Sequence, residues 1–239
     1  MGRRGWVLSL YREAGEAGGC WRVPPRVEGW GGRPDPARAA EEASRRARAM
    51  IRRYCAANRL NRLGTLTYAG EGCHDPLAVR LDAGGFFRRL RGALGGEAFP
   101  YLWVPEWHPG GHGLHLHFAV GRYVKQSLIR DVWGKGIVHI KLLGDLPVGS
   151  GSLEEARLAA RYLGKYAGKA LDGDRPAGLH RYEVGRGFKP QPVAVEGRTV
   201  EDVIGQASGL MGGQPSHVWH SSRADGWAGP PACWVQWSG

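Results

Sequence analysis

The stretch YLWVPEWHPGGHGLHLHFAV, residues 101–120, decides the fold that the sequence predicts. Two largely apolar segments, residues 101–107 and 114–120, flank a Pro-Gly-Gly group at residues 109–111. Proline and glycine at these positions favour a tight turn between two strands. The stretch therefore predicts an antiparallel β-hairpin.

Two histidines, His115 and His117, flank one leucine on the second predicted strand. Alternate side chains of a strand point to one face, so both imidazoles project to the same side and can hold one metal ion. Such a pair is more often an ordinary polar pair, so a third ligand matters. Glu106 on the first strand ranks first, His108 second and His112 third, because a one-residue slip of the hairpin would exchange the faces.

Helices and strands alternate on both sides of the hairpin. Asp35 followed by Pro36 marks the start of a helix that runs to residue 58. Ser152 opens another helix with a capping box, and Gly173 is its expected stop. Further strands are expected at residues 6–11, 62–69, 136–144 and 180–188, and further helices from about residue 82 and at 125–133. This order predicts an α+β fold, with an antiparallel central β-sheet flanked by helices.

The segment YLGKYAGK, residues 162–169, places two phenols and two ammonium groups on one helix face. Tyrosines four residues apart can simply pack against each other, with the lysines extending around them. A phenol can also attack a DNA phosphate and form a covalent phosphotyrosine, while a metal ion polarises the phosphate and a lysine stabilises the added charge. The residues concerned are Tyr162, Lys165, Tyr166 and Lys169.

The chain of 239 residues has a net charge of +11, with arginine far more common than lysine. A surplus of this size favours a polyanionic partner, nucleic acid first. An arginine run in the first long helix can face DNA or form an ordinary solvated face. The run comprises Arg45, Arg46, Arg48, Arg52 and Arg53.

Several classes of protein are disfavoured by the sequence. The four cysteines form no C-x-x-C pair, which argues against a zinc ribbon or a disulfide framework. No long apolar run suits a membrane helix, and the apolar stretch at the N-terminus is too short for a signal peptide, so we expect a cytoplasmic protein with no membrane partner. No GxxxxGK[ST] phosphate loop is present, so we expect no helicase activity in this chain.

The sequence resembles the HUH endonucleases, specifically the Rep class that initiates rolling-circle replication. Three motifs in the family's order carry the resemblance: the strand LGTLTYA at residues 63–69, HLH at 115–117 and YLGKYAGK at 162–169. The resemblance implies a ferredoxin- or RRM-like core. It also implies a metal-dependent, sequence-specific endonuclease that nicks a replication origin through a covalent 5′-phosphotyrosine and so initiates, and with a second tyrosine terminates, replication.

The resemblance also implies roles for individual residues. Tyr162 and Tyr166 match the alternate nucleophiles of two-tyrosine initiators of bacteriophages and plasmids, although a one-tyrosine mechanism stays open. Lys165 and Lys169 match the phosphate-facing lysines. Glu106 matches the third ligand of a Mg²⁺ or Mn²⁺ ion. Thr65, Thr67 and Tyr68 match a motif that is structural or contacts DNA.

The implied partners are single-stranded and origin DNA, a host helicase and a DNA polymerase. The expected boundaries are an arm with a basic helix at residues 1–58, an endonuclease core at 59–190 and an irregular tail at 191–239. Two other interpretations remain. One is a non-catalytic module that binds single-stranded DNA or RNA, and the other is a one-tyrosine HUH transposase.

Overall fold

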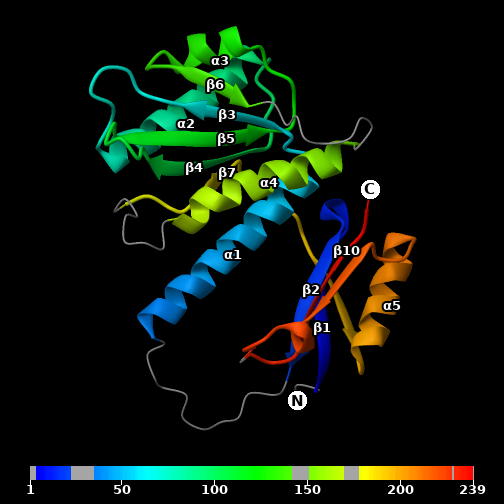
Figure 1. Cartoon of the computed structure of the whole chain (residues 1–239). Coiled ribbons are helices and arrows are strands. Elements are labelled where there is room, and N and C mark those ends of the chain that lie inside the picture. Colours follow the sequence, from blue (N-terminus) through cyan, green and yellow to red (C-terminus); the bar gives the residue numbers. More distant parts are fainter. Residues whose placement is uncertain (1–3, 23–34, 142–150, 170–177, 228, 239) are drawn as a thin grey trace. The chain divides into compact units, whose positions relative to one another are not determined.

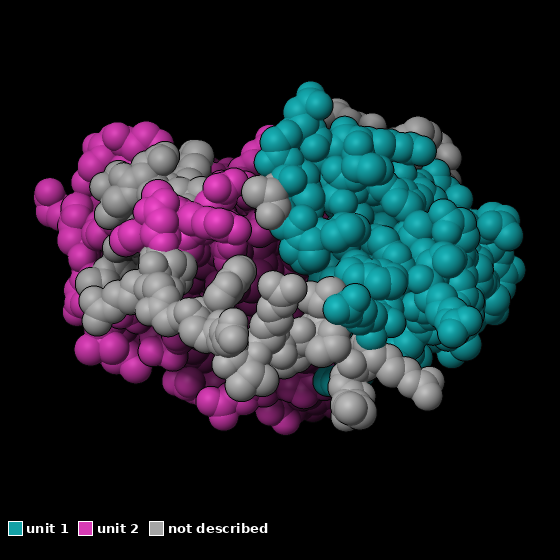
Figure 2. Space-filling view, turned by 90° about the horizontal axis from the view of Figure 1, so that it is seen from below, with its two compact units in different colours: residues 1–33, 190–239 teal, residues 34–189 magenta. Residues whose placement is uncertain are grey.

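The computed structural model describes residues 4–22, 35–141, 151–169, 178–227 and 229–238. The chain divides into two compact units, residues 1–33 with 190–239 and residues 34–189 (Figure 2). Within the described residues the secondary structure comprises five α-helices and two five-stranded antiparallel sheets, which confirms the predicted α+β fold. In the same residues, no helix is both long and apolar enough to cross a membrane.

The first unit combines both ends of the chain in one sheet with the strand order β8-β1-β2-β10-β9. Leu8 and Leu10 alternate with more exposed residues on β1, and they pack with Val195 and Val235 against Val203 of α5. Helix α5 begins where the Thr199 hydroxyl accepts a hydrogen bond from the Asp202 backbone N–H at 3.1 Å. The elements are β1 (Gly5–Tyr11), β2 (Glu16–Arg22), β8 (Val193–Gly197), α5 (Val200–Met211), β9 (His217–His220) and β10 (Ala232–Gln236).

This unit differs from the expected irregular arm and tail. The strand expected at residues 6–11 is present as β1, but β2 and the elements after Pro190 were not expected. Glycines interrupt β2, and β8, β9 and β10 have only four or five residues each, so no sustained period-2 pattern marks them. Each strand is stabilised by pairing with distant segments, for example β10 with β2, and a local pattern does not encode such pairing.

The second unit has a sheet with the strand order β6-β3-β5-β4-β7, in which every pair is antiparallel. The hairpin predicted from residues 101–120 forms its centre, with both strands at their predicted bounds. The strands are β3 (Arg62–Leu66), β4 (Tyr101–Trp107), β5 (Leu114–Val120), β6 (Val138–Lys141) and β7 (Glu183–Val184).

Two pairs of helices cover the two faces of this sheet. Side by side, α1 (Pro36–Ala57) and α4 (Gly151–Lys169) pack on the face that carries Leu102 and Val104 (Figure 1). On the opposite face, α2 (Pro76–Ala93) and α3 (Gln126–Trp133) pack around Phe86, Phe118 and Trp133. Alternate residues of the central strands therefore serve two separate cores.

An aspartate followed by a proline marks the start of both α1 and α2. The Asp35 carboxylate accepts a hydrogen bond from the Ala37 N–H at 3.2 Å, and the Asp75 carboxylate accepts one from the Leu77 N–H at 2.8 Å. Helix α2 thus begins at Pro76, earlier than predicted, because Asp75 and Pro76 carry the same start signal as Asp35 and Pro36.

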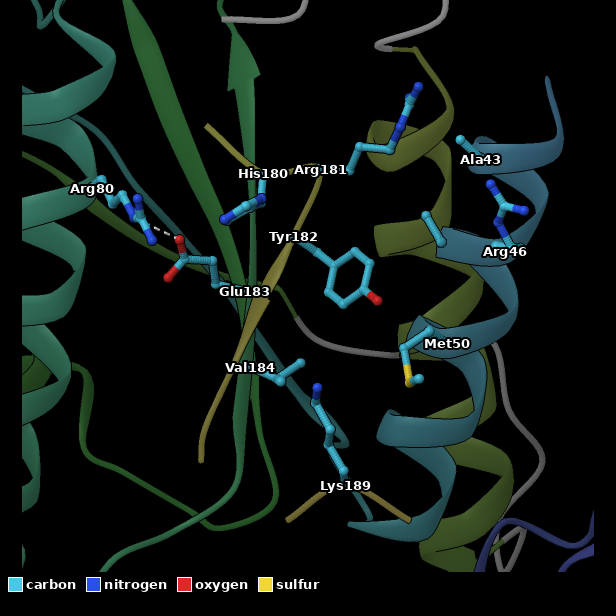
Figure 3. A pocket seen from close by; sticks show the side chains of 11 residues that line it. Ala43, Arg46, Met50, Arg80, His180, Arg181, Tyr182, Glu183, Val184 and Lys189 are labelled. Carbon is cyan, nitrogen blue, oxygen red and sulfur yellow. Dashed lines mark ion pairs between the residues drawn. The ribbon is translucent and has the colours of Figure 1, made fainter. Parts of the chain in front are cut away.

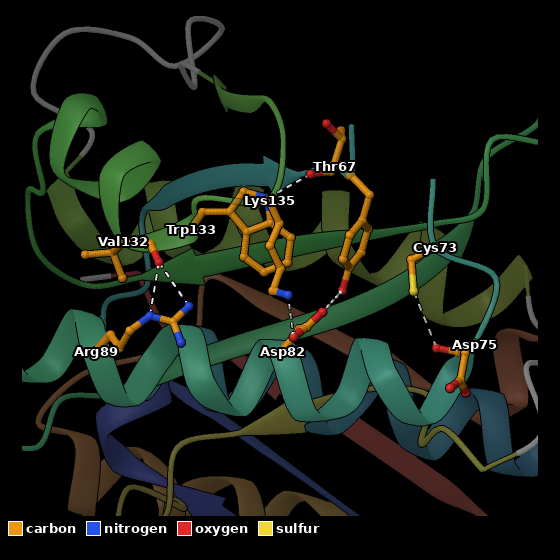
Figure 4. A network of polar contacts seen from close by, with 9 residues as sticks. Thr67, Cys73, Asp75, Asp82, Arg89, Val132, Trp133 and Lys135 are labelled. Atoms are coloured by element: carbon orange, nitrogen blue, oxygen red, sulfur yellow. Dashed lines mark hydrogen bonds and ion pairs between the residues drawn. The ribbon is translucent and has the colours of Figure 1, made fainter. Parts of the chain in front are cut away.

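Polar contacts connect the end of β3 to α2 and α3 (Figure 4). The Tyr68 hydroxyl donates to Asp82 at 3.1 Å, and the Trp133 indole N–H donates to the Thr67 carbonyl at 2.7 Å. The Thr67 hydroxyl lies 3.1 Å from both the carbonyl oxygen and the N–H of Ile137. Thr67 and Tyr68 are therefore engaged in contacts that hold this face of the fold together.

Replacing Leu102, which is fully buried between the sheet and α1/α4, tests this layering. Leu102→Ala should lower the free energy of unfolding of the second unit by about 3 kcal/mol through lost burial and a residual cavity. Leu81→Ala is the matched control, because 65% of Leu81 is exposed on α2 and its loss should cost less than about 0.5 kcal/mol. Urea unfolding followed by circular dichroism measures both, and equal losses would contradict the assignment of Leu102 to the core.

Candidate active site

The pairing of β4 with β5 places the three predicted metal ligands on one face. Glu106 lies directly opposite His115, and His117 lies two residues further along β5, opposite Thr65 of β3. Directly paired residues project to the same side, so all four side chains emerge on the face covered by α1 and α4. This pairing fixes the register of the hairpin, so Glu106 and the two histidines share a face as expected.

Both ring nitrogens of His117 have polar neighbours. Nε2 lies 2.7 Å from Oε2 of Glu106, and Nδ1 lies 3.0 Å from the Thr65 hydroxyl. Only 5% of the His117 surface is exposed, and a buried imidazole is costly unless its nitrogens are satisfied. Two strands therefore fix the orientation of this ring.

His115 lies in a group of histidines at the turn end of the hairpin. Its ring centroid is 4.5 Å from that of His108, which in turn is 6.2 Å from that of His112. Burial lowers the pKa of His115 to about 4, with smaller contributions from the neighbouring His108 and His117, while Glu106 acts in the opposite direction. His115 is therefore neutral at pH 7 and keeps a nitrogen lone pair.

Both tyrosines of α4 point at His117. The Tyr166 ring stacks on the imidazole at a centroid distance of 3.8 Å and an interplanar angle of 11°, and the Tyr162 ring meets it edge-on at 6.1 Å. The Tyr166 hydroxyl donates to the Tyr162 hydroxyl at 2.7 Å. The structure thus brings HLH and the tyrosine helix into direct contact.

The two phenols have different surroundings. Burial raises the pKa of Tyr166, and its hydrogen bond to Tyr162 raises it further. The Lys141 ammonium lies 4.8 Å from the centre of the Tyr162 ring. The phenolate of Tyr166 is therefore costly to form. Tyr162 has a cation and a hydrogen-bond donor beside it.

The other predicted residues have varied positions. Lys165 is exposed on α4, and the side chain of Lys169 lies outside the described part of the structure. The arginine run is on α1, with Arg45 and Arg46 exposed and Arg52 and Arg53 half-buried. Thr65, expected to be structural or to contact DNA, contacts His117.

The donor set suits a divalent ion, because two imidazoles and a carboxylate are hard-to-borderline ligands. Neighbouring ligands of an octahedral ion at about 2.1 Å lie about 3 Å apart. The 2.7 Å between His117 and Glu106 is close to that spacing, although in the described residues no three His, Cys, Asp or Glu side chains are grouped to hold an ion. Metal binding would therefore replace the mutual hydrogen bond of this pair.

Two parts of the site were not predicted from the sequence. Lys141 reaches Tyr162 from β6, and Thr65 positions His117 from β3. The pairing of β3 with both β5 and β6 creates these contacts. Lys141 has no local sequence signal, and Thr65 matches a family motif that does not indicate its contact with His117. Only the strand order would have indicated these two contacts.

Two substitutions of Tyr166 separate its stack from its hydrogen bond. Tyr166→Phe keeps the stack on His117 and should lower the free energy of unfolding by about 1 kcal/mol, the usual net value of one hydrogen bond. Tyr166→Ala loses both and should lower it by about 2 to 3 kcal/mol.

Urea unfolding of both variants measures these losses, with Tyr123→Ala as the control because 72% of Tyr123 is exposed. A loss from Tyr166→Ala no greater than that of the control would contradict the stack.

Residues 61–171 match the family model described as Replication-associated protein ORF2/G2P. The matched segment is somewhat less than half of the chain, and it contains β3, the histidine strand and the whole tyrosine helix. No curated protein and no solved structure matches the chain significantly. The chain is therefore similar, over the segment that forms the site, to replication-associated proteins.

Proposed function

We propose that this protein is a metal-dependent endonuclease that nicks one strand of a replication origin through a tyrosine and so initiates rolling-circle replication. The observation that carries the proposal is the direct contact of two tyrosines with the histidine-carboxylate cluster, 3.8 Å between the rings of Tyr166 and His117. The similarity to replication-associated proteins over the same residues supports it.

Tyr162 is the proposed first nucleophile. Its oxygen attacks the scissile phosphorus, the bond from phosphorus to the 3′ oxygen breaks, and the strand leaves with a 3′-hydroxyl that carries the displaced proton. The 5′ phosphate stays on the tyrosine. Tyr166 donates a hydrogen bond to the Tyr162 oxygen, and Lys141 lies over the ring, so developing phenolate charge is stabilised from two sides.

The residues proposed to hold a Mg²⁺ or Mn²⁺ ion are His117, Glu106 and His115. When bound, such an ion polarises the scissile phosphate and stabilises the leaving oxygen. The Thr65 hydroxyl beside Nδ1 of His117 keeps Nε2 as the nitrogen that faces Glu106. His115, neutral at pH 7, contributes an imidazole from the same face.

Tyr166 is proposed as the second tyrosine of a two-tyrosine initiator. Once Tyr162 carries the displaced strand, the hydroxyl of Tyr166 lies one hydrogen bond away and can attack a second origin at termination. Lys165, exposed on the same helix, is proposed to contact the phosphate, and Lys169 keeps the same sequence-based role. The arginines of α1, Arg45, Arg46, Arg52 and Arg53, are proposed to contact DNA, and a host helicase and a DNA polymerase are the proposed partners.

Cleavage of a pool of labelled single-stranded DNA of random sequence, with Mn²⁺, tests the activity. Wild type should release fragments whose 3′ ends a DNA polymerase can extend, and Tyr162→Phe should reduce this release at least 100-fold because the attacking oxygen is gone. Tyr166→Phe should reduce it about 10-fold by removing one hydrogen bond to the phenolate. Full activity of Tyr162→Phe would contradict the choice of nucleophile.

Thr65 offers a test of the metal site that does not depend on cleavage. Thr65→Val keeps the shape of the side chain but removes the hydroxyl beside His117, so the affinity for Mn²⁺ should fall 10- to 100-fold, as is typical for such supporting contacts. Thr65→Ser should retain wild-type affinity, and His217→Ala, an exposed residue of β9 in the first unit, serves as the histidine control. Calorimetric titration with Mn²⁺ measures all three, and equal affinities throughout would argue against His117 as a ligand.

A non-catalytic module for single-stranded nucleic acid is the second candidate. The observation that favours it is the hydrogen bond between His117 and Glu106, which satisfies both groups without an ion. This candidate predicts tight binding of single-stranded DNA with no cleavage at any Mn²⁺ concentration.

A further inference from the structure

A cavity of about 570 Å³ opens in the second unit between α1, α2 and the segment that contains β7 (Figure 3). It lies at the edge of the sheet, where Val184 pairs with Leu102 and Glu183 pairs with Trp103 of β4. Its volume is within the range of sites for small organic ligands. The cluster of histidines, Glu106 and tyrosines described above uses none of the residues that line the cavity, and Arg46 is shared with the α1 arginines proposed to contact DNA.

The cavity is strongly basic. Three arginines and one lysine line it, against one carboxylate, Glu183. Arg80 forms an ion pair with Glu183 at 2.9 Å, so these two charges offset each other. Arg46, Arg181 and Lys189 also line it, so the lining contains more cationic than anionic side chains, which favours an anionic ligand and phosphate in particular.

Apolar and aromatic side chains line two opposite sides of the cavity. Met50 of α1 lines one side, and Val184 and the Tyr182 ring lie across from it (Figure 3). Tyr182 is half-buried and packs against the same core as the two site tyrosines, so its ring is held in place. A fixed aromatic ring beside cations suits the flat base and the phosphate of one nucleotide.

The cavity adjoins the tyrosine helix. One guanidinium nitrogen of Arg181, Nη1, donates to the carbonyl of Ala167 at 3.4 Å, and Ala167 directly follows Tyr166 on α4. A residue that lines the cavity therefore contacts the same helix that carries both tyrosines.

We propose that this cavity is a second nucleotide site, which holds a base and a phosphate of the single-stranded DNA beside the nicked position. The proposal rests on the proposed function. Arg46 and Lys189 contact the phosphate, and the unpaired base packs between Tyr182 and Met50. A base within a duplex is stacked and paired, so the site selects single strands. A free nucleotide has the same chemistry and is tested separately.

Binding of a fluorescently labelled 20-nucleotide single strand, measured by anisotropy at several salt concentrations, tests the site. The double variant Arg46→Ala/Lys189→Ala should bind the strand about 10-fold more weakly. Because two phosphate contacts are lost, the slope of log K against log salt concentration should be less steep by about 1.4. Arg130→Ala is the control, because Arg130 is exposed on α3, on the other face of the sheet. A double variant no weaker than this control would overturn the proposal.

A direct contact is tested by photo-crosslinking of the wild-type protein to single strands that carry 5-iododeoxyuridine. A crosslink at Tyr182 supports the site, and crosslinks confined to other residues overturn it. Deoxynucleoside triphosphate is the competing probe: inhibition of strand binding only at millimolar concentration supports a strand site. Saturation of the cavity by the free nucleotide at micromolar concentration, with strand binding unchanged, overturns it.

These measurements use binding and crosslinking, so they separate the cavity from the nicking activity. A strand that binds through the cavity without ever being cut would contradict the proposed function and support this site. Normal cleavage by a double variant that binds DNA like wild type would support the proposed function and contradict this site.

Discussion

The stack of Tyr166 on His117 is the interaction on which the site depends. It joins the central hairpin to α4, and the His117 side chain is buried while Tyr166 is half-buried. A buried imidazole needs a partner for each nitrogen, and Glu106 and Thr65, on the two neighbouring strands, provide them. The position of the tyrosine helix and the orientation of the histidine are therefore fixed by the same contact.

The fold supports this contact by dividing the sheet between two cores. Phenylalanine and tryptophan side chains dominate the core under α2 and α3, whereas the core under α1 and α4 combines leucines and Tyr54 with the alanines Ala119, Ala159 and Ala160. Small side chains allow α4 to approach the sheet closely, so that the tyrosine rings reach His117. The basic cavity that we assign to the DNA strand lies at the β7 edge of the same sheet.

Much of this arrangement could be predicted from local patterns. The hairpin bounds, the helix start at Asp35 and the grouping of Tyr162 with Tyr166 follow from periodicity and turn chemistry that the sequence carries directly. The role of Thr65 and the approach of Lys141 depend on which strands are neighbours, and local sequence does not encode the order β6-β3-β5-β4-β7. The sheet formed by the two chain ends was missed for the same reason.

The most direct test of the central claim, that the histidine strand and the tyrosine helix form one catalytic site, is to identify the residue that carries DNA. The protein is incubated with single-stranded DNA and Mn²⁺, digested, and mapped by tandem mass spectrometry. We predict a nucleotide on Tyr162 that is absent when a chelator is added and when Glu106 is replaced by Gln. A nucleotide on a residue other than Tyr162 or Tyr166, or none from DNA that the protein binds, would contradict the account.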